Sequence, residues 1–398
     1  MRRKKLAFIL GIRPDLIRAS LMLRYLKEDK LVKTIFIWSG QHYSENLKDI
    51  FIQELKVPRP DIELDCNGET DAEIVSKLIV NLYRVLNSLK PDVTVFLGDT
   101  NTTVGCLAAA QLNIPIVHVE GGMRSYDWRM PEEKNRTVID HLSDLIYVYL
   151  DEYKTQAVRE GINSKNIVVV GNPIVDVLNQ YYYKNIKFKR LASHSFFSRR
   201  GISKNNYYLM TFHRRENLQD LKIFQAVLDL LSQLPYPIFF PASYRTQDIL
   251  KTNKIRLGNQ FIMVDPIGYH DFLTLLVNSR AVLTDSGTVV EEACILGVPS
   301  LQIRHSTERP QTYDVGSSVK LDPVSLNHYP PKVIFQKLDH LRRCTWKHNF
   351  GDGKTSKRIV SDLVKKLLNG QLKGHLPENY HFPIKRSFRE DNLKVKWL

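Results

Sequence analysis

Short apolar segments alternate with longer amphipathic segments along the chain, and the two kinds differ in their hydrophobic period. The apolar segments of the first half have the length of buried strands and cover residues 4–10, 34–38, 92–97, 114–119, 145–149 and 167–170. Between them, apolar positions recur at helical spacing over residues 16–27, 71–89, 102–111, 133–142 and 151–160. Strands that alternate with helices predict a doubly wound parallel sheet.

The same alternation starts again after a basic connector, residues 184–200. Strands are expected at residues 207–211, 237–241, 261–264, 281–284 and 300–303, with helices at 218–233, 269–278 and 289–296. A last helix over residues 357–369 is expected to be capped by Thr355 or Ser356 and to end at Gly370. We therefore predict an α/β protein with two doubly wound, Rossmann-like domains that face a cleft. The expected bounds are residues 1–183 and 184–370, followed by a basic and aromatic tail, residues 371–398.

Composition agrees with a globular protein of two domains. The chain has 398 residues, of which 43% are hydrophobic and 25% charged, and this length exceeds what one core usually holds. No apolar stretch approaches the ~20 residues of a membrane span, and the basic start leads into only a short apolar run. We expect a cytoplasmic protein without stable membrane insertion. The four cysteines are widely spaced, so we expect reduced thiols and no metal site.

Charge favours an anionic ligand without choosing one. The chain carries 57 Lys and Arg against 42 Asp and Glu, a net charge of +15. The basic segments contain no nucleic-acid-binding motif. We expect a small anionic substrate and a solvated basic surface, and no nucleic acid.

Ionisable side chains follow two of the expected strands in the first half. Asp99 and Glu120 each come directly after an apolar run, and Glu132, Glu133 and Arg136 lie at the start of the next helix. Ligands of parallel sheets bind beyond the carboxyl ends of the strands, so these carboxylates are candidates for moving a proton. The alternative for Glu132 and Glu133 is a solvated first helical turn that complements the helix dipole.

The turn after the first strand suits a phosphate better than a dinucleotide. It contains no GxGxxG; instead Gly11 makes the turn, Arg13 projects from the loop and Pro14 can start the next helix. The Arg13 guanidinium at a helix N-terminus would clamp a diphosphate or, in the alternative interpretation, cap a neighbouring carbonyl. We therefore expect no nicotinamide site.

Turns of the second half carry a similar signal. Ser286 and Gly287 lie between a strand and a helix, so their N–H groups could hold phosphate oxygens, while Glu292 on that helix could accept from ribose hydroxyls. His213 and Arg214 follow the first strand of this half and would line the same cleft.

Ten short motifs occur in order between about residue 8 and residue 320. They are GIRPD, SGQH, LGDTNTT, HVEGGMRS, MPEEKNR, VVGNP, HRREN, DPIGY, TDSGTVVEEA and RHSTERP. Together they resemble the motifs of the non-hydrolysing UDP-N-acetylglucosamine 2-epimerase family. The resemblance implies a GT-B type arrangement, with the last helix crossing back to the first domain, and a homodimer. It also implies inversion at C2 of a UDP-linked N-acetylhexosamine, such as UDP-GlcNAc to UDP-ManNAc, for cell-surface polysaccharide precursors and without a cofactor.

The resemblance also implies roles for single residues. The implied catalytic groups are Asp99, Glu120, Glu132 and His213, with Arg18 at a position where lysine is usual. The implied substrate-binding groups are Arg13, Arg136, Arg214, Phe272, Ser286, Gly287, Glu292 and Arg309. Phe272 would lie near uracil, Ser286 and Gly287 on phosphate, and Glu292 on ribose. In this chemistry UDP and the C2 proton leave to give a 2-acetamidoglycal, and UDP adds again after a proton reaches the other face.

Two departures from the family pattern keep alternatives open. Gly121 after Glu120 is similar to hydrolysing relatives, which release free sugar and UDP, whereas Thr100 and the MPEEKNR motif favour the non-hydrolysing form. A GT-B glycosyltransferase would share the UDP site but would need an acceptor. The short loop over residues 124–131, with Trp128 and Arg129, resembles members that act on modified sugars, so the identity of the sugar stays open.

Two segments outside the catalytic motifs also carry expectations. The tail from residue 373 on contains none of the motifs, so we expect it to be dispensable for the chemical step. Gln41 and His42 are present, but Ser44 stands where the family usually has a longer polar residue. By this resemblance, we expect weak or absent activation by a second substrate molecule.

Overall fold

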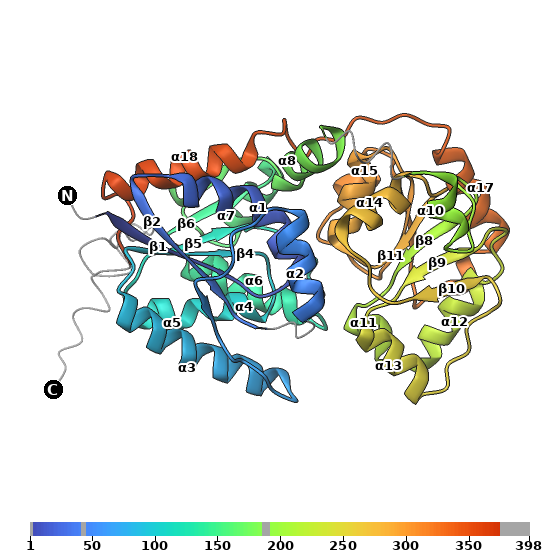
Figure 1. Cartoon of the computed structure of the whole chain (residues 1–398), viewed down its shortest axis with the longest axis horizontal. Helices are drawn as coiled ribbons and strands as arrows, with labels where there is room; N and C mark the ends of the chain where they lie inside the picture. The colour runs from blue at the N-terminus through green and yellow to red at the C-terminus, as the bar shows by residue number, and fades with distance from the viewer. Residues whose placement is uncertain (1–2, 41–44, 185–191, 375–398) are drawn as a thin grey trace, which may run out of the picture.

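The computed structural model describes residues 3–40, 45–184 and 192–374. It consists of two α/β bodies side by side, each a twisted sheet covered by helices (Figure 1). The predicted fold class, with two doubly wound parallel sheets, is confirmed. Gln41, His42 and Ser44, and the tail from residue 375 on, lie outside the described residues.

The first sheet has parallel strands in the order β3-β2-β1-β4-β5-β6-β7. Their bounds are β1 (Lys4–Leu10), β2 (Val32–Trp38), β3 (Ile62–Glu63), β4 (Val93–Leu97), β5 (Ile116–Val119), β6 (Leu145–Val148) and β7 (Ile167–Val169). The strand order reverses between β1 and β4, which leaves a crevice at the carboxyl ends of these strands. Gly98, Asp99 and Glu120 follow β4 and β5 directly, so they lie at this edge.

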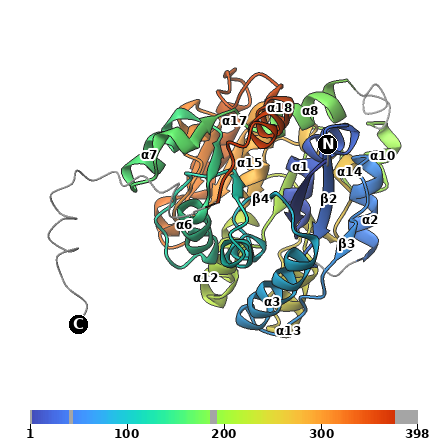
Figure 2. The ribbon, with the colours of Figure 1, turned by 90° about the vertical axis from the view of Figure 1, so that its left-hand side faces the viewer.

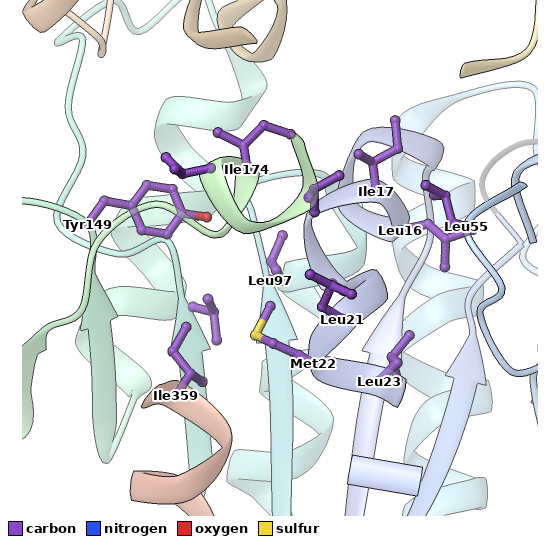
Figure 3. Close-up of a cluster of buried hydrophobic side chains, with 14 of the residues drawn as sticks. Leu16, Ile17, Leu21, Met22, Leu23, Leu55, Leu97, Tyr149, Ile174 and Ile359 are labelled. Atoms are coloured by element: carbon purple, nitrogen blue, oxygen red, sulfur yellow. The ribbon is translucent and has the colours of Figure 1, made fainter. Parts of the chain in front are cut away.

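Helices cover both faces of the first sheet. Successive side chains of β1 pack on opposite faces. Leu6, Phe8 and Leu10 point into one core cluster, whereas Ala7 and Ile9 point into the cluster on the other face. The helices of this half are α1 (Arg13–Glu28), α2 (Glu45–Glu54), α3 (Asp71–Leu89), α4 (Asn101–Val104), α5 (Cys106–Gln111), α6 (Pro131–Leu142), α7 (Asp151–Arg159), η1 (Ser164–Asn166), α8 (Pro173–Leu178) and η2 (Asn179–Tyr183). The cluster that contains Leu6, Phe8 and Leu10 is called the first core cluster, and Figure 3 shows part of it.

The second sheet repeats the design with the order β10-β9-β8-β11-β12-β13, again parallel. Its strands are β8 (Tyr208–Thr211), β9 (Ile238–Pro241), β10 (Phe261–Val264), β11 (Val282–Thr284), β12 (Ser300–Ile303) and β13 (Ser318–Leu321). Its helices are α10 (His194–Ser198), α11 (Arg215–Leu218), α12 (Leu221–Leu231), α13 (Tyr244–Thr252), α14 (Tyr269–Val277), α15 (Gly287–Ile295), α16 (Gln311–Asp314), η3 (Leu326–His328) and α17 (Pro331–Leu341). The order reverses between β8 and β11, so His213 and Asp285 lie at the matching crevice.

The last helix, α18 (Thr355–Leu368), packs against α1 and α8 of the first half. Both ribbon views place it there (Figure 1, Figure 2). The expected cap from Thr355 or Ser356 is wrong, because both residues lie inside the first turn of α18. The carboxylate of Asp176 on α8 takes over this task and accepts from the backbone N–H groups of Thr355, at 3.1 Å, and Ser356, at 2.6 Å. Gly370 follows the helix with φ +66°, as expected for a C-terminal glycine.

Two expected helices are each divided in the structure. The helix predicted over residues 102–111 breaks at Gly105, where a Cβ would stand 2.8 Å from Leu82 Cδ2 on α3. The helix predicted over residues 218–233 is α11 followed by α12, because Asp220 accepts from the N–H groups of Lys222 and Ile223 and so starts a new helix. The sequence patterns also missed the edge strands: β3 has only two residues, and β13 mixes polar with apolar residues and buries only Leu321.

Other features of the described residues bear on the class of protein. No helix in these three ranges is long and apolar enough to cross a membrane. Within the same ranges, no three His, Cys, Asp or Glu side chains converge on a metal position. A cavity of about 400 Å³ lies at the amino end of β5, lined by Ala110, Asn113, Ile114, His141 and Asp144 among others, away from the strand-end carboxylates.

Candidate active site

Charged side chains that follow strands of both sheets meet between the two halves of the chain, and this region is called the cleft below. Arg309 of the second half donates from Nη2 to Glu120 Oε1 of the first half, at 2.8 Å. Arg214 Nη1 lies 3.1 Å from Glu132 Oε1 in the same way. The structure therefore brings together candidates that are far apart in the sequence.

Glu120 is the centre of this arrangement. Its backbone has φ +83°, a conformation that costs energy for a residue other than glycine, and its N–H donates to Tyr147 O at 3.0 Å. Its carboxylate accepts from Arg18 Nη1, from the Tyr149 hydroxyl at 2.8 Å and from Arg309. The side chain is buried, so the three donors hold the carboxyl group in one orientation.

Arg18 links Glu120 to a second buried carboxyl group. Its Nη2 donates to Asp15 Oδ1 at 2.6 Å. Burial raises the pKa of Asp15 to about 8; Arg18 opposes this shift, while Glu120 and Asp99 add to it. Pro14 lies in the first turn of α1, as predicted.

Asp99 and Glu133 share the guanidinium of Arg136. Arg136 donates from Nη2 to Asp99 and from Nη1 to Glu133 Oε2, at 2.5 Å. Burial alone would raise the pKa of Asp99, but Arg136 and Arg214 outweigh it and hold this pKa below its usual value. This lowered pKa favours the ionised form of Asp99.

The two neighbouring glutamates at the start of α6 have different surroundings. Glu133 is buried and accepts from the backbone N–H groups of Ser125 and Tyr126, so it holds the loop before α6. Glu132 keeps 27% of its side chain exposed and faces Arg214 across the cleft. The solvated-turn alternative is wrong for Glu133, because that side chain is 1% exposed and fully engaged.

A buried carboxylate positions the turn that carries His213 and Arg214. Asp285, just after β11, accepts from the N–H groups of His213 at 2.9 Å and Arg214 at 2.8 Å. His213 keeps 44% of its side chain exposed, and its Nδ1 is 3.6 Å from Asp285 Oδ1. The imidazole is thus accessible from the cleft, while its backbone is fixed.

Sequence reasoning missed the acidic partners of Arg309. Glu308 is buried against Arg304, at 2.9 Å, and accepts from Arg309 Nη1. Burial would raise the pKa of Glu308, but Arg304 and Arg309 hold it well below its usual value. Arg309 Nε also lies 3.1 Å from Glu291 Oε1. The alternation of arginine and glutamate in RHSTERP was the available signal, but it does not tell which charges pair.

The candidates for the nucleotide lie on α1, α14 and α15. The Arg13 guanidinium stands 5.6 Å from the centre of the Phe51 ring. Ser286 precedes α15 and Gly287 begins it; a Cβ at Gly287 would come within 2.3 Å of Arg309 Nη1, so no other residue fits without a shift. Phe272 on α14 is partly buried against the first core cluster.

Glu292 is more deeply buried than we expect for a side chain that accepts from ribose hydroxyls. Its Oε1 accepts from the Tyr269 hydroxyl at 2.7 Å, and its side chain is buried. Burial raises the pKa of Glu292 to about 8, with the hydrogen bond from Tyr269 opposing this shift.

Two α/β domains whose strand ends meet in this way define an architecture of the GT-B type. A sequence model of the family described as UDP-N-acetylglucosamine 2-epimerase matches residues 24–364. The chain belongs to this family of isomerases, which confirms the resemblance seen in the motifs.

Individual relatives support the assignment. The UDP-N-acetylglucosamine 2-epimerase of Methanocaldococcus jannaschii is 37% identical over 371 residues, which cover 90% of this chain and 99% of that protein. A UDP-2,3-diacetamido-2,3-dideoxy-D-glucuronate 2-epimerase of Pseudomonas aeruginosa is 32% identical and covers 79% and 87%. The crystal structure of the M. jannaschii UDP-GlcNAc 2-epimerase in complex with UDP-GlcNAc and UDP has a TM-score of 0.81 at 35% identity and covers 91% and 99%.

Proposed function

We propose that this chain inverts C2 of a UDP-linked N-acetylhexosamine by eliminating and adding back UDP, without hydrolysis. The observation that carries the proposal is that Glu120 and Glu132 of the first domain pair with Arg309 and Arg214 of the second, while Arg136 of the first domain holds Asp99. Carboxylates can move the C2 proton, and cations stabilise a departing diphosphate. UDP-GlcNAc is the first substrate to test, because the similar M. jannaschii structure contains it.

The proposed reaction has two balanced stages. A carboxylate takes the C2 proton while the C1–O bond breaks, and its electron pair leaves with UDP, so that a 2-acetamidoglycal remains. UDP then re-forms the bond to C1 as a proton is delivered to the opposite face of C2. Because no carbon changes its oxidation state overall, the proposal needs no redox cofactor.

We assign roles by the places of the side chains. Asp99, Glu120 and Glu132 exchange the proton, while Arg18 holds Glu120 and His213 assists the departing diphosphate. On the binding side we assign Arg13, Arg136, Arg214, Phe272, Ser286, Gly287, Glu292 and Arg309. Arg136, Arg214 and Arg309 each pair with a carboxylate, so a bound diphosphate would compete with these carboxylates for them. We further propose a homodimer and a role in the supply of polysaccharide precursors.

The hydrolysing alternative depended on Gly121, and the structure offers a packing reason for this glycine. A Cβ there would stand 2.2 Å from Ile146 Cγ2 and 2.6 Å from Asp140 Oδ1. A glycine that packing requires carries no signal for hydrolysis, so we favour the non-hydrolysing reaction.

Chromatography of an incubation with UDP-GlcNAc alone tests the proposal. We expect two UDP-sugars at equilibrium and no accumulation of free hexosamine. Stoichiometric UDP and reducing sugar would show a hydrolase, and no change until an acceptor is added would show a glycosyltransferase.

A further inference from the structure

Tyr149 and Glu120 are the first residues after two neighbouring parallel strands. Glu120 follows β5 and Tyr149 follows β6, and the register pairs Val119 with Tyr147. The Tyr149 hydroxyl donates to Glu120 Oε2 at 2.8 Å, and both side chains are buried, 2% and 4% exposed. No motif of the sequence pointed to this tyrosine.

The ring of Tyr149 is fixed by apolar packing. It belongs to the first core cluster, and Figure 3 shows it among apolar side chains that include Ile174. Its carbonyl accepts from Gly171 N–H at 3.2 Å, which ties the backbone to the end of β7. The hydroxyl therefore has a defined place beside Glu120.

Tyr149 differs chemically from the other two donors to Glu120. Arg18 and Arg309 carry only donors and keep their charge at every working pH, so neither can accept a hydrogen bond from a protonated Glu120. A phenol hydroxyl can donate to a carboxylate and can also accept from a carboxylic acid. It is the one partner of the three that can accept from Glu120 once Oε2 carries a proton.

We propose that Tyr149 is a positioning residue that holds Glu120 in place through both of its protonation states during proton transfer at C2. The inference rests on the proposed epimerase function. Its consequence is that loss of the hydroxyl affects the chemical step and its pH dependence more than substrate binding.

The charged surroundings of the pair come from four elements. They are Asp15 and Arg18 on α1, Tyr153 on α7, Glu291 on α15, and Glu308 and Arg309 in the segment before α16. Burial raises the pKa of Tyr149 well above its usual value, and Glu120 adds to this shift. The hydroxyl therefore keeps its proton throughout the pH range of an assay.

Tyr149→Phe removes only the hydroxyl, and Tyr147→Phe is its matched control. Tyr147 is also buried on β6, and its hydroxyl donates to a carboxylate, Asp362 on α18, at 2.8 Å, outside the cleft. We expect Tyr149→Phe to lower kcat about 10-fold to 100-fold, the effect of a hydrogen bond to a charged group, with KM changed less than about threefold. We expect its acidic limb of kcat against pH to move to higher pH, because the ionised carboxylate loses a donor. Tyr147→Phe should change neither.

A second replacement at position 149 distinguishes the loss of the hydrogen bond from a folding defect of the Tyr149→Phe protein. Incorporation of 3-fluorotyrosine at position 149 keeps the hydroxyl but makes it a stronger donor, so the acidic limb should move to lower pH, opposite to Tyr149→Phe. A Tyr149→Phe protein that melts like the wild type and has its kcat and pH profile would overturn the inference, as would equal shifts in both tyrosine variants. If the wild type itself epimerises no UDP-N-acetylhexosamine, the proposed function fails instead.

Discussion

Arg309 and Glu120 form a buried hydrogen-bonded ion pair across the cleft, 2.8 Å between Nη2 and Oε1, although 189 residues separate them. One partner belongs to each domain, so the carboxylate group that we propose for proton transfer is complete only when the two domains lie together. The ion pair of Arg214 and Glu132 likewise joins one residue of each domain. Because each residue has its own partners and surroundings, substitutions can separate effects on catalysis, on nucleotide binding and on stability.

The two glutamates at the start of α6 should respond differently to the same substitution. Glu132→Gln is expected to lower turnover about 10²-fold to 10⁴-fold, the contribution of a positioned proton-transfer group, and to leave the melting temperature unchanged. Glu133→Gln should instead destabilise the protein by about 1–3 kcal/mol, because it weakens a buried ion pair with Arg136 and the hold on the loop. Steady-state kinetics measure the turnover of both variants, and urea unfolding measures their stability. A stable, inactive Glu133→Gln with an active Glu132→Gln would reverse the assignment.

Arg13 should contribute to binding as well as to rate. Arg13→Ala is expected to weaken UDP binding about 10-fold to 100-fold, because a guanidinium on the diphosphate acts in the ground state and the transition state. Arg24→Ala is the matched control on the same helix, where Arg24 contacts the Tyr181 hydroxyl outside the cleft. Calorimetry with UDP distinguishes them. Equal UDP affinity for Arg13→Ala and the wild type would remove Arg13 from the nucleotide site.

Glu292 should make stability depend on pH. With a pKa raised to about 8, the folded protein keeps this proton where the unfolded chain, with a pKa of about 4.3, has lost it. Stability should therefore fall as the pH rises between these two values. Glu292→Gln lacks the ionisable group, so its free energy of unfolding relative to the wild type should increase from pH 5 to pH 8 in urea titrations without UDP. Glu28→Gln, on the exposed side of α1, corrects for the general loss of a charge. A difference that stays constant with pH would contradict this prediction.

Gly121 should act on packing and leave the reaction products unchanged. Gly121→Ala places a methyl group against Ile146 and Asp140, so we expect a loss of stability of about 1–3 kcal/mol. We expect the variant, like the wild type, to form UDP-sugars without free hexosamine. A wild type that releases free sugar, together with a Gly121→Ala variant that suppresses the release, would instead make Gly121 a determinant of hydrolysis.

The sequence was informative where a local pattern determines the structure. The apolar runs before Asp99 and Glu120 end at the carboxyl ends of β4 and β5, so their place at the edge of the sheet followed from periodicity. The cap of α18 could not be predicted, since Asp176 lies on another helix far away in the sequence. Tyr149 and Glu308 were missed for a related reason. A strand pattern predicts burial, but it does not tell which side chain the Tyr149 hydroxyl will meet on the neighbouring strand, or which of the nearby arginines will pair with Glu308.

The central claim is that the C2 proton is exchanged during each inversion, and incubation in D₂O tests it most directly. The wild type with UDP-GlcNAc in D₂O, followed by proton NMR, should show deuterium at C2 of both UDP-sugars at equilibrium. Glu132→Gln should slow this exchange in proportion to its turnover. Formation of the epimer with the C2 hydrogen fully retained would contradict the proposed proton transfer by carboxylates in the cleft.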